Sequence, residues 1–571
     1  MNKKILLYVI LMLAFFVRIV GLDFGLPFTY HDDEPIIVNY ALSYGTGDLS
    51  PHTFNVPPFL SYLLCFQYGI FYLLGRLFGA FKSINDFGYL FLNNPTIFYL
   101  IGRFTLGVIP GVLSVFFIYL LGKKVFNRDI GLIAALFLAF NFLHARDSHY
   151  IYLDVPLMMV LTLLYLKSMD LIRTNSTRYY ICVGVLTGIA TAIKYFGPAL
   201  GPFLIAVFAH NFIVYKDQIR KNLLKSGLFI VAAIATFYIL NPYALLEHGS
   251  FLAALTRMPL GARDALFHIK FSLIGSMGLL MLCCSILGIC TAFIKKNKNI
   301  LLLSVFIFSY YLIIMMKSQA AERYVMPLLP LLLLSSAYFV YTAVSFLKRP
   351  IIRKMALISV SCVLVVPSAQ KLVLADRLFL RDDTRTKAYA WVKENVLSGS
   401  VVAVDALSSG FPRLEKEKSQ IREVYSQDRD ITFDEADKPL DLKKRLMLSN
   451  PDYPKDTYHI YYMRGTKIRG FHSVYPDILF DFDELKHKGV DYVIISTALG
   501  DKKYRGFLKT LKSNSVLVKA FSPYAEGITR YSPEEKTSLP AAAFSLDELK
   551  NRTRFGPHIE IYKIRQLERS V

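Results

Sequence analysis

Long apolar segments alternate with short polar ones over roughly the first two thirds of the chain. Apolar runs such as Ile5 to Leu22, Ile97 to Leu121 and Leu331 to Leu347 reach or approach the roughly 20 residues that cross a bilayer core as a helix. A soluble core has no use for so many runs of this length. Because 54% of all residues are hydrophobic and only 19% are charged, the composition is also too apolar for a soluble enzyme of several domains. The pattern predicts a polytopic α-helical membrane protein.

Lys and Arg residues fall in short clusters between the apolar runs. The clusters are Lys3 and Lys4; Lys123, Lys124 and Arg128; Arg173 and Arg178; Lys216, Arg220, Lys221 and Lys225; Lys295, Lys296 and Lys298; and Lys348, Arg349, Arg353 and Lys354. Such clusters favour the cytoplasmic side of the membrane. Eleven spans place all of them inside, near 5–22, 97–121, 129–145, 153–172, 179–196, 197–215, 226–241, 271–294, 299–316, 324–347 and 354–373. The tail from about 375 then lies outside the cytoplasm.

The segment from Val56 to Gly79 decides this orientation. It is long and apolar enough to span, but in the eleven-span arrangement it lies in or near the outer interface. Tyr68, Tyr72 and Arg76 recur at helical spacing and form a semi-polar stripe that suits a helix at headgroup level. If the segment spanned instead, the tail would lie in the cytoplasm. We favour the interfacial position.

The composition changes once, near residue 375, from membrane to soluble character. We therefore expect a transmembrane domain over 1–374, with a first outer loop over 23–96, and an extracytoplasmic α/β domain over 375–571. Asp383 can cap a helix that runs to about Val396, with Ala388, Trp391 and Val392 on its apolar side. Short strand-like runs follow at 401–404, 459–462, 490–495, 516–518 and 558–562.

The formal net charge of +22 does not indicate a nucleic-acid partner, because much of the basic charge orients the spans and no basic and aromatic surface module is present. All six cysteines lie in apolar segments. This placement predicts neither a disulfide framework nor a thiolate metal site.

Three consecutive acids, Asp32, Asp33 and Glu34, follow the first span. Acids beside a membrane are often solvated loop residues. In the eleven-span arrangement, however, Asp154 at the mouth of a later span lies on the same side of the membrane as these acids. Asp154 could cap its helix, take part in chemistry, or do both.

Several cations lie at a similar expected depth in the membrane: Arg18, Arg103, Lys194 and Arg323. A charge inside a span is costly and usually has an anionic partner, although Arg18 and Arg323 could instead extend to the outer headgroups. A lipid phosphate that enters from the outer leaflet would satisfy several of these cations together. Because no Walker loop or Rossmann fingerprint is present, the sequence does not indicate a nucleotide donor.

These residues resemble the GT-C superfamily and, within it, glycosyltransferase family 39, which includes protein O-mannosyltransferases and aminoarabinose transferases. The matching pieces, in chain order, are Arg18; Asp33-Glu34; Pro57-Pro58; Arg103; Arg146 with Asp154-Val155-Pro156-Leu157; 186–195, ending in Lys194-Tyr195; Arg323-Tyr324 before Pro327 and Pro330; Asp383-Thr384-Arg385; and Ala390-Trp391-Val392. The last two pieces look like the start of the soluble domain of many bacterial members. The resemblance implies a GT-C fold with interfacial helices in the first outer loop.

The resemblance also implies a polyprenyl-phosphate sugar donor and inverting transfer to an acceptor hydroxyl on a protein, lipid or glycan. It implies that Asp33 is the catalytic base and that Glu34 helps to set up the site, although the extra Asp32 leaves open which neighbour faces the acceptor. We group Asp154 with these catalytic acids. The candidate phosphate-binding cations are Arg103, Arg146, Lys194 and Arg323.

Some related enzymes use a divalent metal, and the candidate ligands for one here are His31, Asp32 and His149. The sequence has no tight metal-ligand spacing such as His-x-x-x-His. The expected location is the bacterial plasma membrane. The alternatives are a sugar-polymer ligase or polymerase that uses lipid-linked donors, and a transporter or flippase. The first tends to place its key residues in a late outer loop, and the second often shows inverted repeats, which we do not find. A purely structural role would leave Arg103 and the early acids unexplained.

Overall fold

The computed structural model describes residues 2–565 except for 32, 257–265, 318–320, 406–411, 428–437, 464–465, 468–472, 475–477, 479, 497–503 and 528–544. The chain forms two compact units. The first contains residues 1–22, 48–65 and 101–376, and the second contains 23–47, 66–100 and 377–571.

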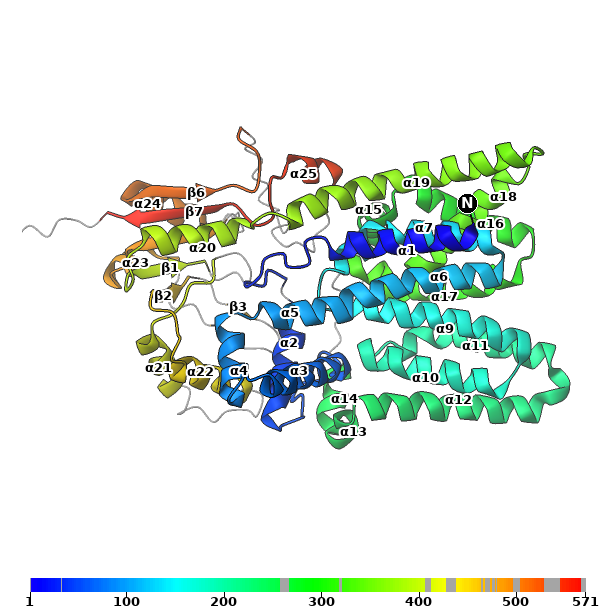
Figure 1. The fold of residues 1–571 in the computed structure, drawn as a ribbon, viewed down its shortest axis with the longest axis horizontal. Helices are drawn as coiled ribbons and strands as arrows, with labels where there is room; N and C mark the ends of the chain where they lie inside the picture. The colour runs from blue at the N-terminus through cyan, green and yellow to red at the C-terminus, as the bar shows by residue number, and fades with distance from the viewer. Residues whose placement is uncertain are drawn as a thin grey trace, which may run out of the picture. The chain divides into compact units, whose positions relative to one another are not determined.

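The first unit is helical, and its long helices run side by side (Figure 1). Its α-helices are α1 (Lys3–Ile19), α6 (Ile109–Val125), α7 (Arg128–Ala139), α8 (Phe142–Asp147), α9 (Asp154–Thr174), α10 (Thr177–Lys194), α11 (Gly197–Val214), α12 (Ile219–Leu240), α13 (Tyr243–Leu246), α14 (His248–Thr256), α15 (Ile274–Met277), α16 (Leu279–Ile294), α17 (Lys298–Met315), α18 (Leu329–Val344) and most of α19 (Pro350–Phe379). Short 3-10 or π turns are η2 (Arg103–Val108), η3 (Lys216–Gln218), η4 (His268–Leu273) and η5 (Glu322–Leu328). Helices α3 (Phe59–Leu77) and α5 (Thr96–Gly102) contribute residues to both units.

Small residues let neighbouring helices approach closely in this unit. A Cβ atom on Gly122 of α6 would lie 2.7 Å from the Cα of Gly131 in α7, and one on Gly288 of α16 would lie 2.1 Å from the carbonyl oxygen of Ser335 in α18. In a membrane, lipid tails remove the hydrophobic drive between helices, so close packing of this kind is what holds them together.

By length and composition, eight helices in the described residues could cross a membrane. The count is nine if His268–Met277 and Leu279–Ile294, which are bent by 103°, form one broken span. The chain is therefore a multi-pass helical membrane protein, while the expected number of eleven spans remains a prediction. Helix α3 passes the same test at the lower limit of hydropathy, so its interfacial position also remains a prediction.

Two further expected spans also differ in form from the sequence-based prediction. The expected span at 129–145 is broken near Asn141, whose side chain caps α8 by accepting from the His144 N–H at 3.1 Å. The expected first span ends early, at Ile19 of α1. Capping by Asn141 explains the break, because its side chain accepts from the start of a new helix. Hydropathy does not indicate this break, because the run is apolar on both sides of Asn141.

Arg18 is buried within the helices and does not extend to headgroups. Its side chain is fully buried, and it donates to the carbonyls of Ala139 at 3.1 Å and Leu138 at 3.3 Å. These carbonyls end α7, where the negative end of the helix dipole favours a cation. The snorkelling alternative for Arg18 is therefore wrong, and we assign Arg18 to holding α1 against the end of α7.

The second unit contains a sheet covered by helices. Its elements are α2 (Glu34–Ser43), η1 (Tyr44–Thr46), α4 (Ile84–Asn93), α20 (Thr384–Asn395), β1 (Val401–Val404), α21 (Lys418–Gln427), α22 (Lys438–Ser449), β2 (His459–Tyr462), β3 (Thr466–Lys467), β4 (Ser473–Val474), α23 (Phe482–His487), β5 (Tyr492–Ser496), α24 (Arg505–Asn514), β6 (Ser515–Phe521), α25 (Leu546–Asn551) and β7 (Ile559–Ile564).

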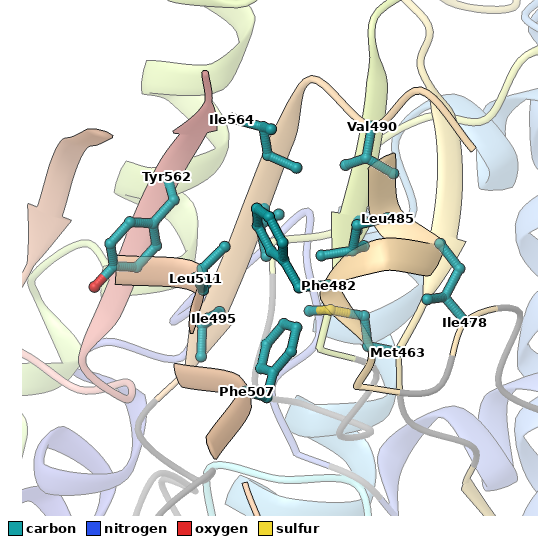
Figure 2. Close-up of a cluster of buried hydrophobic side chains, with 12 residues drawn as sticks. Met463, Ile478, Phe482, Leu485, Val490, Ile495, Phe507, Leu511, Tyr562 and Ile564 are labelled. Carbon is teal, nitrogen blue, oxygen red and sulfur yellow. The ribbon is translucent and has the colours of Figure 1, made fainter. Parts of the chain in front are cut away.

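The main sheet has the order β2-β1-β5-β7-β6. Strand β1 pairs in parallel with β2 and β5, whereas β7 pairs antiparallel with β5 and β6. On one face, Phe482 and Leu485 of α23 and Phe507 and Leu511 of α24 pack in a cluster with strand residues such as Ile495 (Figure 2). On the other face, Ala388 and Val392 of α20 pack with other strand residues. Strand β1, which lies between two parallel neighbours, is apolar throughout, as expected for a strand with both faces covered.

The local predictions for this region are confirmed. Asp383 caps α20 by accepting from the Arg385 N–H at 2.9 Å, and β1 and β2 have the predicted bounds. The other three predicted strands overlap β5, β6 and β7. The expected domain boundary near residue 375 remains a prediction.

Candidate active site

The early acids lie at the start of α2 in the second unit. Asp33 precedes the helix and its backbone N–H donates to His31 Nδ1 at 3.2 Å, while Glu34 is the first helical residue and is fully buried. Pro35 follows within the first turn, where its fixed φ suits a helix start. Asp32 lies outside the described residues. The structure thus places Asp33, half-buried, at a defined helix start.

Asp154 lies between two cations in the first unit. Its carboxylate, 3% exposed, accepts from Lys194 Nζ, and its other oxygen is 3.6 Å from Arg323 Nε. The second distance is too long for a hydrogen bond but short enough for charge attraction. Lys194 ends α10 and Arg323 belongs to η5, so a carboxylate at the start of α9 joins three elements.

A further lysine, which the sequence analysis did not single out, belongs to the same group. Lys317 Nζ lies 4.7 Å from the centre of the Tyr324 ring, and Lys194 Nζ lies 5.4 Å from the same ring. Burial, and then the neighbouring Lys194 ammonium, lower the pKa of Lys317. Lys317 lies two residues beyond the end of α17, so a rule that flags every charge near the end of a span would have found it.

Arg323 completes the group through an aromatic contact. Its guanidinium carbon lies 4.7 Å from the centre of the Tyr152 ring. In the described part of the chain, Lys194, Lys317 and Arg323 thus gather near the carboxylate of Asp154 and two tyrosine rings. Asp147 lies close enough to interact electrostatically with both Asp154 and Arg323. We call Asp154 and the three cations the Asp154 cluster. Their side chains carry more positive than negative charge, which favours an anionic ligand.

Arg146 has carboxylate partners of its own. It lies 2.8 Å from Asp147 and 3.2 Å from Glu322, and only 2% of its side chain is exposed. Buried Arg–carboxylate pairs of this kind hold elements together, and here the Arg146–Glu322 pair joins α8 to η5. The phosphate-binding role of Arg146 remains a prediction, and the structure gives the residue a bridging position.

Arg103 has a backbone partner. The side chain is 1% exposed and Nη1 donates to the carbonyl of Leu22 at 2.7 Å. Leu22 lies just beyond α1, where the chain leaves the helix. No residue type in the sequence indicates a backbone acceptor of this kind. The donor-phosphate role of Arg103 remains a prediction.

We expect Arg103→Ala to lower the thermal stability of the ligand-free protein by about 1–3 kcal/mol, because the buried Leu22 carbonyl loses its donor. Arg103→Lys should retain part of this stability through its ammonium. Thermal unfolding of the purified protein in detergent measures both variants. An Arg103→Ala variant as stable as the wild type would contradict the structural role.

We also expect the affinity of the Asp154 cluster for a phosphate ligand to fall as the pH rises toward the ordinary lysine pKa of about 10.4. The Lys317 ammonium must keep its proton to attract phosphate, and its lowered pKa means that the proton is lost earlier than from an ordinary lysine. Thermal-shift titrations at several pH values measure this dependence, with Lys317→Met as the control. An equally steep decline in Lys317→Met would contradict it.

Two of the candidate metal ligands, His31 and His149, contact backbone groups, and the third, Asp32, lies outside the described residues. His149 has Nδ1 3.0 Å from the carbonyl oxygen of Ala145 and Nε2 3.0 Å from that of Val20, so both ring nitrogens face protein acceptors. Among the described residues, no group of three or more His, Cys, Asp or Glu side chains is placed to hold a metal ion. Metal dependence remains a prediction.

Comparisons with known proteins give one family match and several similar solved structures. Residues 102–244 match the family described as dolichyl-phosphate-mannose-protein mannosyltransferase. This range contains Arg103, Arg146, Asp154 and Lys194, four of the candidate site residues. The comparison with curated proteins found no match.

Two of the similar structures come from Cupriavidus metallidurans and Archaeoglobus fulgidus. The first is ArnT bound to undecaprenyl phosphate, with 12% identity, a TM-score of 0.47, and coverage of 90% of this chain and 96% of that one. The second is an oligosaccharyltransferase in complex with Zn and sulfate, with 14% identity, a TM-score of 0.46, and coverage of 88% and 69% respectively.

The family match falls on the segment that runs from Arg103 past Lys194, where the sequence motifs had indicated the same relationship. It therefore confirms the resemblance to the GT-C membrane glycosyltransferases, and within them to family 39.

Proposed function

We propose that this protein transfers a sugar from a polyprenyl-phosphate donor to an acceptor hydroxyl on the extracytoplasmic face of a bacterial plasma membrane. The observation that carries the proposal is the Asp154 cluster, in which Lys194, Lys317 and Arg323 lie near the carboxylate of Asp154. A phosphate is the anion that such a cluster suits, because Arg can bind it with two parallel hydrogen bonds and Lys as a point charge. We assign this phosphate to a lipid, because the chain is a multi-pass membrane protein.

The reaction begins with proton removal. Asp33 accepts the proton of the acceptor hydroxyl, and the oxygen attacks the anomeric carbon from the face opposite the phosphate. The bond between this carbon and the phosphate oxygen breaks, and its electron pair leaves with polyprenyl phosphate. The product therefore has inverted configuration at the anomeric carbon. Glu34, which follows Asp33 in the sequence and is fully buried, helps to set up the acceptor side of the site.

The leaving phosphate needs charge stabilisation more than protonation. Lys194 and Arg323 are partly accessible, with 20% and 26% of their side chains exposed, whereas Arg146 is almost fully buried. We therefore assign the direct phosphate contacts to Lys194, Arg323 and Lys317. Asp154 fixes the first two of these cations so that little reorganisation is needed during transfer. Arg103 and Arg146 remain candidates for the same phosphate.

The proposal is tested with the full chain in nanodiscs and radiolabelled undecaprenyl-phosphate hexose and pentose donors. Release of undecaprenyl phosphate reports cleavage of the donor bond whichever acceptor is used, and water or added peptide, lipid or glycan can serve as acceptors. We expect release from one donor class above that of empty nanodiscs. Intact donors of both classes with every acceptor would contradict the proposal.

A further inference from the structure

We propose that Arg385 is a positioning residue, which fixes Tyr30 and through it the short segment that carries Asp33. This inference rests on the proposed function of Asp33. All of the contacts that carry it lie within the second unit, between the segment 24–30 and the part of the chain that begins at Arg377. They give a physical role to the Asp383-Thr384-Arg385 motif, which the proposed chemistry does not use.

Tyr30 is buried against Arg385. Only 3% of Tyr30 is exposed, the guanidinium carbon of Arg385 lies 3.8 Å from the centre of its ring, and its hydroxyl lies 2.8 Å from Thr386 Oγ1. A cation over an aromatic face is attracted by the ring, and the attraction is stronger away from water. The ring is therefore held both at its face and at its hydroxyl.

The guanidinium itself has a rigid support. Asp383 accepts from Arg385 Nε at 2.7 Å and from Nη2 at 2.7 Å, and both side chains are fully buried. The same Asp383 caps α20. A two-point contact with a carboxylate fixes the plane of the guanidinium as well as its position. Lysine could replace the charge of Arg385 but not this plane.

Neighbouring residues of the segment are held in the same way. Phe24 packs on Phe555, with ring centres 5.3 Å apart, and Phe28 packs on Tyr389 at 4.7 Å. The Thr29 hydroxyl accepts from Arg413 Nη1 at 3.1 Å. The segment 24–30 is thus held by contacts at several positions, the last of which is Tyr30.

Only two residues separate Tyr30 from Asp33. A chain extends at most about 3.6 Å per residue, so Asp33 lies within roughly 11 Å of Tyr30 along the backbone. Helix α2 begins directly after Asp33. Asp33 therefore lies between the fixed Tyr30, three positions before it, and the first turn of a helix. Misplacement of a catalytic group by about 1 Å can cost a hundredfold in rate. Loss of the Tyr30 contacts should therefore lower kcat and leave the KM for the donor unchanged.

Hydrogen–deuterium exchange of the full chain in nanodiscs tests the inference without any substrate. We expect Tyr30→Leu and Arg385→Ala to raise amide exchange over residues 33–40 at least tenfold, with a smaller rise in Arg385→Lys. Tyr524→Leu is the matched control, because Tyr524 is also a buried tyrosine beside an arginine, Arg552, in the same unit. It should leave exchange over 33–40 unchanged.

Unchanged exchange in a folded Tyr30→Leu variant, or an equal rise in Tyr524→Leu, would overturn the inference. If the larger changes prevent folding, Arg385→Lys decides: no rise in exchange would overturn it. The donor-release assay then separates this proposal from the proposed function. A fall in kcat at constant donor KM in Tyr30→Leu supports positioning. If exchange rises in Tyr30→Leu but Asp33→Asn retains full activity, only the proposed role of Asp33 is contradicted.

Discussion

Asp33→Asn is expected to lower the rate of undecaprenyl phosphate release by about 100- to 10,000-fold, the usual contribution of a general base. Asparagine has nearly the same shape as aspartate and can replace it at the start of α2. Its amide, however, cannot accept the proton of the acceptor hydroxyl. Donor binding should persist, because the donor phosphate is assigned to the Asp154 cluster. Initial rates with saturating donor measure the effect.

Asp32→Asn is the control for this result. The two neighbours have the same chemistry, and only one of them is assigned to the acceptor. Near-normal release in Asp33→Asn together with loss in Asp32→Asn would move the base by one residue. Normal release in both variants would remove these acids from proton transfer.

Lys194→Met is expected to weaken undecaprenyl phosphate binding about 10- to 100-fold, because a hydrogen bond to a charged group contributes about 1.5–3 kcal/mol. Methionine keeps much of the apolar stem and removes the ammonium. The variant also removes the ion pair with Asp154. Ligand-induced thermal stabilisation measures the affinity.

Lys124→Met is the matched control for that loss. Lys124 also pairs with an aspartate, Asp170, within the first unit, but it belongs to a cluster expected on the cytoplasmic side. Both variants therefore remove one lysine–aspartate pair. The account predicts normal undecaprenyl phosphate binding in Lys124→Met, and an equal loss in both variants would show a general effect of ion-pair removal.

Local signals in the sequence were sufficient for much of the C-terminal region that contains the sheet. The Asp383 cap of α20 and strands β1 and β2 follow from side chains within a few residues of each element. In the membrane region, hydropathy gave the helical class but not the form of each span. It could not show that a side chain such as Asn141 interrupts an apolar run, because capping depends on geometry and not on mean polarity.

Long-range partners explain most of what the sequence could not show about the site. The carbonyl that accepts from Arg103 belongs to an apolar residue, Leu22, so no residue type indicates it. Arg146 and Glu322 are far apart in the chain, and nothing local relates them. The Lys194–Asp154 pair was better signalled, because both residues carry charge at span ends on the same expected side of the membrane.

The central claim is that this protein binds a lipid phosphate. Its most direct test compares the thermal stability of the purified protein with undecaprenyl phosphate and with undecaprenol, which has the same chain but no phosphate. At a hundredfold excess over Kd, a single-site ligand should stabilise the folded protein by about 2.7 kcal/mol. The account predicts this stabilisation with undecaprenyl phosphate and little with undecaprenol. Equal stabilisation by the two lipids, or none by either, would contradict it.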